Sequence, residues 1–211
     1  MLIRTLETGS FAANCYLVAC KETLQGLLID PGDDAERIIE MVKENNVTIK
    51  YIFNTHGHFD HTGANEAVRA AFNAPILIHA ADGDLFQKPR ESLAAFFSQK
   101  KLAKPDSLLT DGQQVQFGKL TATVIATPGH TKGSSCLLVE GVLFSGDTLF
   151  AGSVGRTDLP GGSAEELFKS IKEKLLTLPP ETKVYPGHGP DTTIGMELAN
   201  NPYIKQIKAD C

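Results

Sequence analysis

Apolar positions recur at helical spacing in three stretches of the chain. Residues 33–45 predict an amphipathic helix whose apolar face is Ala35, Ile38, Ile39 and Val42. We expect Asp33 and Asp34 to cap its first turn, where carboxylates accept hydrogen bonds from free amides. A second helix is predicted from the spacing of Ala64, Ala67, Val68 and Ala71. Residues 163–166, Ser-Ala-Glu-Glu, form a capping box that opens a third helix, with the inner face Leu167, Phe168, Ile171 and Leu175.

Short apolar runs predict β-strands between these helices. The predicted strands are residues 2–6, 14–19, 24–29, 49–53, 75–78, 115–117, 120–126, 135–139, 142–144 and 183–185. A weak internal repeat relates the two halves, because each has a strand ending in aspartate, a helix and a strand ending in histidine. The pairs are Asp30 with His56 and Asp147 with His188. Such units build layered α/β folds with ligands at strand ends. No Pro-, Gly- or Ser-rich linker separates the halves, so we expect one domain over residues 1–211.

Composition narrows the possible partners. The chain is 42% hydrophobic and 21% charged, as in ordinary globular proteins, and its net charge of −5 argues against broad nucleic-acid contact. No apolar run approaches the roughly 18 residues of a membrane span, and the N-terminus lacks the apolar core of a secretory signal. We therefore expect a cytoplasmic protein with no membrane or nucleic-acid partner, either a monomer or a homodimer. The four cysteines lack a metal or disulfide spacing and are expected to be three buried apolar side chains and one tail thiol.

The candidate chemistry is concentrated directly after the strand 49–53. In Thr-His-Gly-His-Phe-Asp-His, residues 55–61, four groups able to bind a metal fall within six residues: His56, His58, Asp60 and His61. Imidazole nitrogens and carboxylate oxygens are the usual ligands of zinc and iron. Gly57, Gly63 and the preceding strand favour a loop over a helix. On a loop these side chains can spread around two metal ions.

Three more metal-capable residues follow predicted strands, each beside a glycine. They are His130 in Thr-Pro-Gly-His, Asp147 in Phe-Ser-Gly-Asp and His188 in Tyr-Pro-Gly-His. Each is a weak signal alone. Together with the first loop they supply seven ligands, a number that fits two metal ions sharing one carboxylate.

The order His-x-His-x-Asp-His, His, Asp, His over residues 56–188 resembles the metallo-β-lactamase superfamily of hydrolases. The resemblance implies an α/β fold, an αβ/βα sandwich of two mixed sheets flanked by helices. It implies one metal ion on His56, His58 and His130, a second on Asp60, His61 and His188, and Asp147 as the bridge. Asp30, in Ile-Asp-Pro-Gly, matches a position that supports the site from behind. His79 matches no ligand position and is expected to be structural.

Within this superfamily the chain resembles most the short bacterial and archaeal forms of glyoxalase II. The motifs that carry this likeness are residues 126–134, 144–152 and 155–162. The best-known β-lactamases have a cysteine at the position of Asp147, which argues against that activity. Long forms of glyoxalase II hold glutathione with a C-terminal helical domain, whereas only about twenty residues follow His188 here. The thiol carrier therefore stays open.

The resemblance implies a binuclear hydrolase that cleaves S-lactoylglutathione or a similar small anionic acyl thioester to acid and thiol. Zinc is the expected metal, with iron or manganese as alternatives. Two divalent ions with Asp60 and Asp147 leave a positive centre that suits an anionic substrate. A metal-bound hydroxide beside Asp60 would attack the carbonyl. The thiolate leaves without a strong acid, because a thiol has a pKa of about 8.5.

Two other functions stay open. His56, His130 and Asp147 alone could form the facial triad of a mononuclear non-haem iron enzyme. Persulfide dioxygenases of the same superfamily resemble this chain and share its Gly-Arg-Thr-Asp stretch. The other is a non-catalytic or electron-transfer di-iron centre, for which no flavodoxin-like or rubredoxin-like extension is present.

Arg156 and Lys132 are the predicted contacts to an anionic substrate, with residues 82–104 as a cover of one or two short helices. Arg156 lies in a glycine-flanked turn nine residues after Asp147. A guanidinium pairs with a carboxylate in a bidentate fork. The alternative is that Arg156 forms an ion pair with Asp158 and fixes its own loop.

Overall fold

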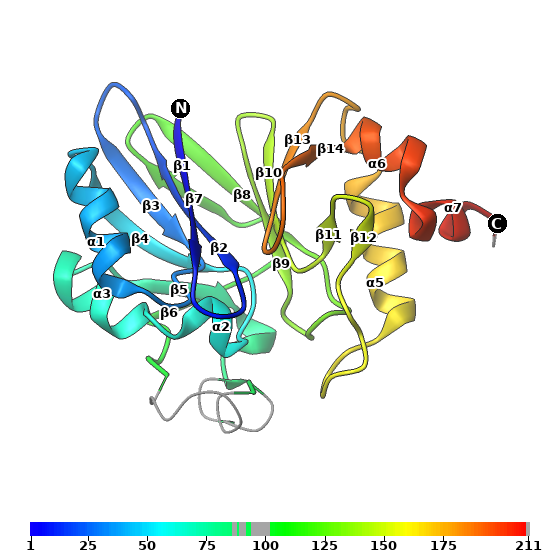
Figure 1. Cartoon of the computed structure of the whole chain (residues 1–211), viewed down its shortest axis with the longest axis horizontal. Coiled ribbons are helices and arrows are strands. Elements are labelled where there is room, and N and C mark those ends of the chain that lie inside the picture. Colours follow the sequence, from blue (N-terminus) through cyan, green and yellow to red (C-terminus); the bar gives the residue numbers. More distant parts are fainter. Residues whose placement is uncertain (86–87, 89–91, 94–101, 210–211) are drawn as a thin grey trace.

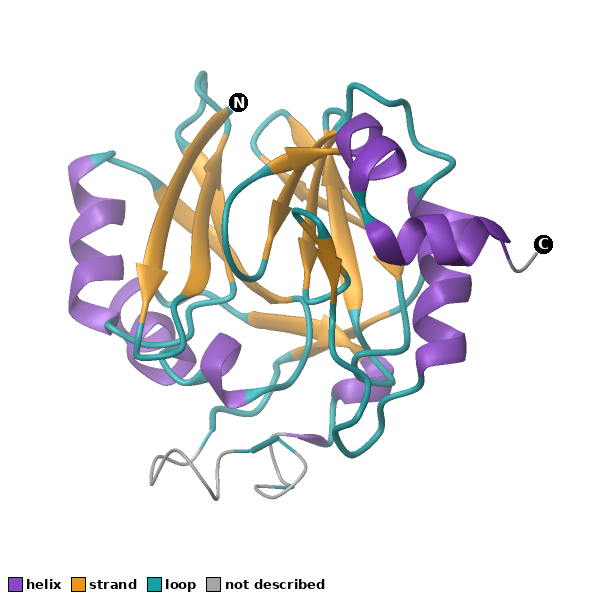
Figure 2. Cartoon of the chain, turned by 45° about the vertical axis from the view of Figure 1, so that its right-hand side comes forward, coloured by secondary structure: helices purple, strands orange, loops and turns teal. Residues whose placement is uncertain are grey.

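The computed structural model describes residues 1–85, 88, 92–93 and 102–209. Two six-stranded sheets pack face to face, and helices cover the outer face of each sheet (Figures 1 and 2). Each sheet contains both parallel and antiparallel pairs. The predicted sandwich of two mixed sheets flanked by helices is therefore confirmed.

The first sheet has the strand order β1-β2-β3-β4-β5-β6. Its strands are β1 (Leu2–Thr8), β2 (Ala13–Ala19), β3 (Gln25–Ile29), β4 (Thr48–Asn54), β5 (Ile76–His79) and β6 (Ser107–Leu109). The strands from β1 to β3 are antiparallel, whereas those from β3 to β6 are parallel. The outer face is covered by α1 (Ala35–Glu44) and α3 (Asn65–Phe72).

The second sheet has the order β14-β13-β10-β9-β8-β7. Its strands are β7 (Gln114–Phe117), β8 (Leu120–Ala126), β9 (Ser135–Val139), β10 (Val142–Gly146), β13 (Lys183–Pro186) and β14 (Thr192–Thr193). A separate hairpin is formed by β11 (Leu149–Phe150) and β12 (Ser153–Val154). The helices on this side are α5 (Ala164–Ser170), its π-helical extension η3 (Ile171–Leu175), α6 (Ile194–Asn200) and α7 (Pro202–Ala209).

The internal repeat seen in the sequence corresponds to two parallel strand pairs. In the first half β3 lies parallel to β4 with α1 between them in the chain, and in the second half β10 lies parallel to β13 with α5 between them. The largest core lies between the sheets and contains Phe53, Phe117 and Phe144, all nearly inaccessible to solvent. Burying such aromatic side chains is the main source of stability for a sandwich of this kind.

The helix caps were predicted correctly at one position and wrongly at another. Ser163 caps α5, because its Oγ accepts a hydrogen bond from the amide of Glu166. Asp34 makes no side-chain cap to α1 in the described structure. It adopts a left-handed backbone (φ 51°), and its carboxylate accepts from the amide of Gly9 and pairs with Arg37. The prediction failed because a long-range partner outcompetes the local one.

The cysteine prediction holds for the three described residues. Cys15, Cys20 and Cys136 are free and buried, and Cys211 lies outside the described residues. Most of the predicted cover, residues 82–104, also lies outside them. Within the part of the chain that the structure describes, no helix combines the length and apolar character needed to cross a membrane.

Candidate metal centre

The candidate site forms where strand ends from both sheets meet. Residues 55–58 follow β4 and lead into the single-turn helix α2 (Phe59–Thr62). Asp30 follows β3, and on the other sheet His130, Asp147 and His188 follow β8, β10 and β13. Fixing each side chain just beyond a buried strand holds its backbone in place, which suits a preorganised site.

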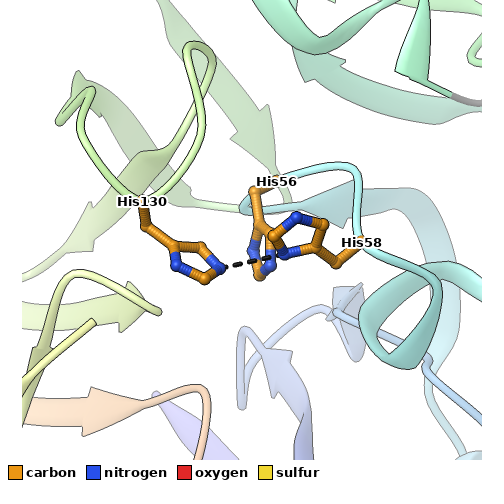
Figure 3. Close-up of side chains that lie close together, drawn as sticks. All are labelled: His56, His58 and His130. Atoms are coloured by element: carbon orange, nitrogen blue, oxygen red, sulfur yellow. Dashed lines mark hydrogen bonds between the residues drawn. The ribbon is translucent and has the colours of Figure 1, made fainter. Parts of the chain in front are cut away.

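Three imidazoles form the first group. Potential ligand atoms of His56, His58 and His130 lie within 4.8 Å of one another, and all three residues are buried. His58 Nδ1 faces His130 Nε2 at 3.0 Å, across 72 residues of sequence. Figure 3 shows the three rings converging from two separate loops. Three nitrogens at this spacing can supply three of the four ligands of a tetrahedral metal ion.

A carboxylate and two imidazoles form the second group, Asp60, His61 and His188. His61 Nε2 lies 3.2 Å from His188 Nε2. The Asp60 carboxylate lies 3.7 Å from His61 Nε2 and 3.5 Å from His188 Nε2. This group is more open than the first, because the His188 side chain is 29% exposed.

Asp147 lies between the two groups. Its Oδ1 is 3.5 Å from His61 Nε2, and its Oδ2 is 3.5 Å from His130 Nε2 and 3.7 Å from His188 Nε2. One carboxylate thus faces histidines of both groups: Oδ1 faces the second group, and Oδ2 faces both groups. This is the placement that a bridging ligand requires.

The unpartnered atoms of the cluster fit metal ions. Within the described residues, His56 Nε2, His58 Nε2 and Asp147 Oδ1 are buried without a hydrogen-bond partner. Buried polar atoms are rarely left so unless an ion or water is their partner. The cluster offers only imidazole nitrogens and carboxylate oxygens, the donor set of zinc, iron and manganese. The histidine and aspartate cluster is compatible with a binuclear metal site.

In three of the imidazoles, the Nδ1 atom has a hydrogen-bond partner outside the cluster. His130 Nδ1 lies 2.8 Å from the carbonyl oxygen of Arg156, and His188 Nδ1 lies 3.1 Å from that of Phe11. His61 Nδ1 lies 3.1 Å from the Asp30 carboxylate. Such contacts fix the ring tautomer with the proton outside and leave Nε2 free as a ligand.

Burial and neighbouring charge separate the pKa values of the histidines. Burial, with the nearby His130, lowers the pKa of His58 to about 3, so its imidazole is neutral at physiological pH. Burial also acts to lower the pKa of His61, but the charges of Asp147 and Asp60 outweigh it and raise that pKa to about 10. The metal-free cluster therefore holds a proton on His61 that a bound cation would replace.

Asp30 lies behind the second group, where the sequence placed it. Its carboxylate accepts hydrogen bonds from the amide of Thr55 at 2.8 Å and from the Thr55 hydroxyl at 2.6 Å, besides facing His61. His79 lies apart, at the start of the short 3-10 turn Ala80–Asp82, where its ring accepts from the amide of Ala81.

The predicted substrate residues lie on loops that adjoin His130: Lys132 is two residues further along the chain, and the Arg156 carbonyl contacts the His130 ring. The Arg156 side chain is 62% exposed and forms a bidentate ion pair with Asp158, with both contacts at 2.8 Å. This is the arrangement of the alternative hypothesis for Arg156. Lys132 lines a cavity of about 250 Å³ together with Thr131 and Gly161. The structure therefore leaves Lys132 beside the loop of His130 and holds the Arg156 guanidinium on its neighbour.

Several residues that hold the site gave no signal in the sequence. Asn14 donates to the carbonyl groups of Pro186 and Gly189 and so holds the loop of His188. Asp82 is a buried carboxylate bonded to two of the ligand loops. The carbonyl groups of Phe11 and Arg156 act through the backbone, which no residue pattern can reveal. Asp82 lies in a segment without regular spacing.

Comparison with known proteins agrees with this geometry. The model of the Metallo-beta-lactamase superfamily matches residues 8–188. The chain belongs to this superfamily. An uncharacterized protein from Aquifex aeolicus is 40% identical over 98% of this chain and 99% of its own length. The hydroxyacylglutathione hydrolase GloC from Haemophilus influenzae is 34% identical over 97% of this chain and 98% of its own.

Solved structures of superfamily members extend the likeness. BLEG-1 B3 metallo-beta-lactamase has a TM-score of 0.91 and 38% identity, covering 96% of this chain and 99% of its own. TTHA1623 in a di-iron-bound form has a TM-score of 0.83 and 38% identity, with 95% and 99% covered. ETHE1 from Myxococcus xanthus has a TM-score of 0.82 and 33% identity, with 98% and 85% covered.

Proposed function

We propose that this chain is a binuclear metal-dependent thioesterase that hydrolyses S-lactoylglutathione or a similar small anionic thioester. The observation that carries the proposal is the position of Asp147, whose two oxygens face histidines of two separate ligand groups. A mononuclear site would need only one of these groups. Similarity to a hydroxyacylglutathione hydrolase over nearly the full length of both chains supports the substrate class.

The ligand roles follow from the two groups. His56, His58 and His130 would hold one ion, Asp60, His61 and His188 the other, and Asp147 both. Divalent ions bound there supply a nucleophile at neutral pH and positive charge against the developing oxyanion. Zinc suits this donor set best, with iron and manganese as alternatives.

The other roles in the reaction, orienting the attacking water and attracting the substrate, are assigned to side chains that are more exposed than the buried histidines. Asp60 is the more exposed of the two carboxylates, at 16% against 11% for Asp147. It would accept a hydrogen bond from the attacking water and orient it. Lys132, exposed beside the cavity, would attract the anionic end of the substrate. The departing thiolate needs no dedicated acid, because a thiol has a pKa of about 8.5.

The second candidate is a mononuclear iron persulfide dioxygenase. The likeness to ETHE1 favours it, as does the ability of His56, His130 and Asp147 to act as two histidines and one carboxylate. A mononuclear site would leave the second group without a metal ion, although Asp60 lies close to His61 and His188 there.

Metal content and three parallel assays separate these functions. The purified protein is expected to hold two ions per chain and to hydrolyse S-lactoylglutathione, with loss of activity on chelation and recovery with zinc. In the parallel assays, hydrolysis of a β-lactam is measured, and oxygen uptake with glutathione persulfide is followed with an oxygen electrode. Asp147→Asn is the inactive control. One iron per chain, oxygen uptake with the persulfide and no thioester hydrolysis would overturn the proposal.

A further inference from the structure

Asp82 is a buried carboxylate that joins two ligand loops from opposite halves of the fold. It ends the 3-10 turn after β5 and is 1% exposed. Its Oδ2 accepts from the amide of Gly57 at 3.0 Å and from the hydroxyl of Thr131 at 2.7 Å. Its Oδ1 accepts from the amide of Gly133 at 2.7 Å. Three donors from two loops thus converge on one side chain.

These donors lie next to the ligands of the first group. Gly57 separates His56 from His58, and Thr131 directly follows His130. The first loop leaves the first sheet and the second loop leaves the second sheet, and Ser135 joins their bases by donating to the Thr55 carbonyl from its amide and its hydroxyl. The hydrogen bonds of Asp82 cross this junction just where His58 Nδ1 and His130 Nε2 face each other at 3.0 Å.

The packing around Asp82 leaves little freedom. A Cβ built on Gly133 would lie 2.5 Å from the amide nitrogen of Asp82 and 2.7 Å from its Cβ. Thr131 is bonded further to the hydroxyl of Ser134 at 2.8 Å. The carboxylate is therefore clamped on both sides and cannot shift without moving a loop.

The direct contacts of the carboxylate are hydrogen bonds from uncharged donors. The side-chain contacts of Asp82 are to two backbone amides and one hydroxyl, and among the described residues the nearby positive group is His79. Burial raises its pKa, whereas the three hydrogen bonds and the charge of His79 act to lower it. A buried carboxylate is costly compared with a well-packed apolar side chain. The placement of its hydrogen bonds, and not a contribution to stability, therefore explains why Asp82 stands at this junction.

We propose that Asp82 is a positioning residue that sets the spacing of His56 and His58 against His130, and so tunes affinity for the metal ion of this group. The inference rests on the ligand roles of the proposed function. Partners that orient metal ligands typically contribute 10- to 100-fold to metal affinity. A merely structural residue would affect both ligand groups alike.

Zinc affinity in two variant backgrounds tests the proposal. His188→Ala retains the three-histidine group, and His58→Ala retains the group of Asp60, His61 and His188. Asp82→Asn is added to each, because one amide oxygen cannot serve all three donors and the amide NH₂ would face a backbone N–H. Zinc is titrated by competition with a fluorescent chelator.

We expect Asp82→Asn to weaken zinc binding by about 10- to 100-fold in the His188→Ala background and by less than about threefold in the His58→Ala background. Asp106→Asn is the matched control, because Asp106 also accepts from a backbone amide, that of Ile76, but away from the site. It should change neither affinity. Equal weakening in both backgrounds, or none in the first, would overturn the proposal.

Thr131→Val provides a second test that does not depend on the stability of Asp82→Asn. It removes one donor to Asp82 at nearly constant volume, so a smaller loss confined to the His188→Ala background is expected. Unchanged zinc affinity there would count against the positioning role. Because the readout is zinc binding, absence of thioester hydrolysis would refute the proposed function and leave this inference standing.

Discussion

Replacing Asp147 with asparagine should disturb both metal positions at once. The substitution keeps the size of the side chain but removes its negative charge. That charge lies 3.5 Å from His61 Nε2 on one side and 3.5 Å from His130 Nε2 on the other. Because the residue faces both groups, the loss cannot be confined to one ion.

The size of the effect follows from Coulomb's law. At an effective dielectric constant of about 20, a unit charge about 4 Å away interacts with another by about 4 kcal/mol. Each 1.4 kcal/mol is about a tenfold change in affinity, so full loss corresponds to about a thousandfold for each unit of positive charge on the ion. Asparagine keeps one oxygen as a weaker ligand, which offsets part of this loss. We therefore expect both binding steps to weaken by at least about 100- to 1,000-fold.

The assay is a zinc titration that resolves two successive dissociation constants, with His188→Ala beside Asp147→Asn. His188→Ala removes a ligand from the second group only, so it should weaken mainly one step. Circular dichroism of the metal-free proteins checks that both variants fold. If Asp147→Asn binds two ions near wild-type affinity, or weakens only the step that His188→Ala weakens, the bridging role is refuted.

Three further outcomes follow from the same contacts. Gly187→Ala should lower the zinc content, because a Cβ there would lie 2.1 Å from Asp147 Oδ1 and 2.9 Å from His61 Cε1; a variant with two tightly bound ions would contradict this. The metal-free protein should lose stability as the pH falls from about 6.5, because His58 takes up a proton when unfolded but not when folded, where its pKa is lowered to about 3. The expected slope is about 1.4 kcal/mol per pH unit for each such proton, and urea midpoints measured in chelator that stay constant from pH 7 to about 4 would refute it. Arg156→Ala should raise the KM for an anionic thioester and leave the metal content unchanged, whereas Asp158→Ala, which breaks the same ion pair but keeps the guanidinium, should not raise KM; equal KM changes in both variants would assign Arg156 to the loop alone.

Much of the architecture could be predicted because local pattern and global fold agree. The apolar face of α1, with Ile38 and Val42 fully buried, follows directly from helical spacing. The repeated strand, helix and strand units predicted a layered α/β fold, and in the structure β3 lies parallel to β4 and β10 lies parallel to β13. The strand β6 was not predicted, because its pattern has only one buried residue, Leu109.

Of the candidate site, the sequence could predict only the side chains of the histidine and aspartate cluster. The structure brings His56, His58 and His130 together as one group and Asp60, His61 and His188 as another, as the resemblance implied. The parts that hold them depend on tertiary contacts. The carbonyl of Phe11 reaches His188 across 177 residues, and a backbone carbonyl carries no sequence signature. Asp34 was predicted to cap a helix, but its carboxylate reaches Gly9 instead.

The arrangement of ligands across two sheets has a kinetic consequence. His58 and His130 are 72 residues apart, and His61 and His188 are 127 apart. Contacts of such sequence separation close large loops and form late in folding. Interactions absent from the folding transition state slow unfolding without speeding folding. Bound metal should therefore prolong the lifetime of the native state while the refolding rate stays that of the metal-free chain.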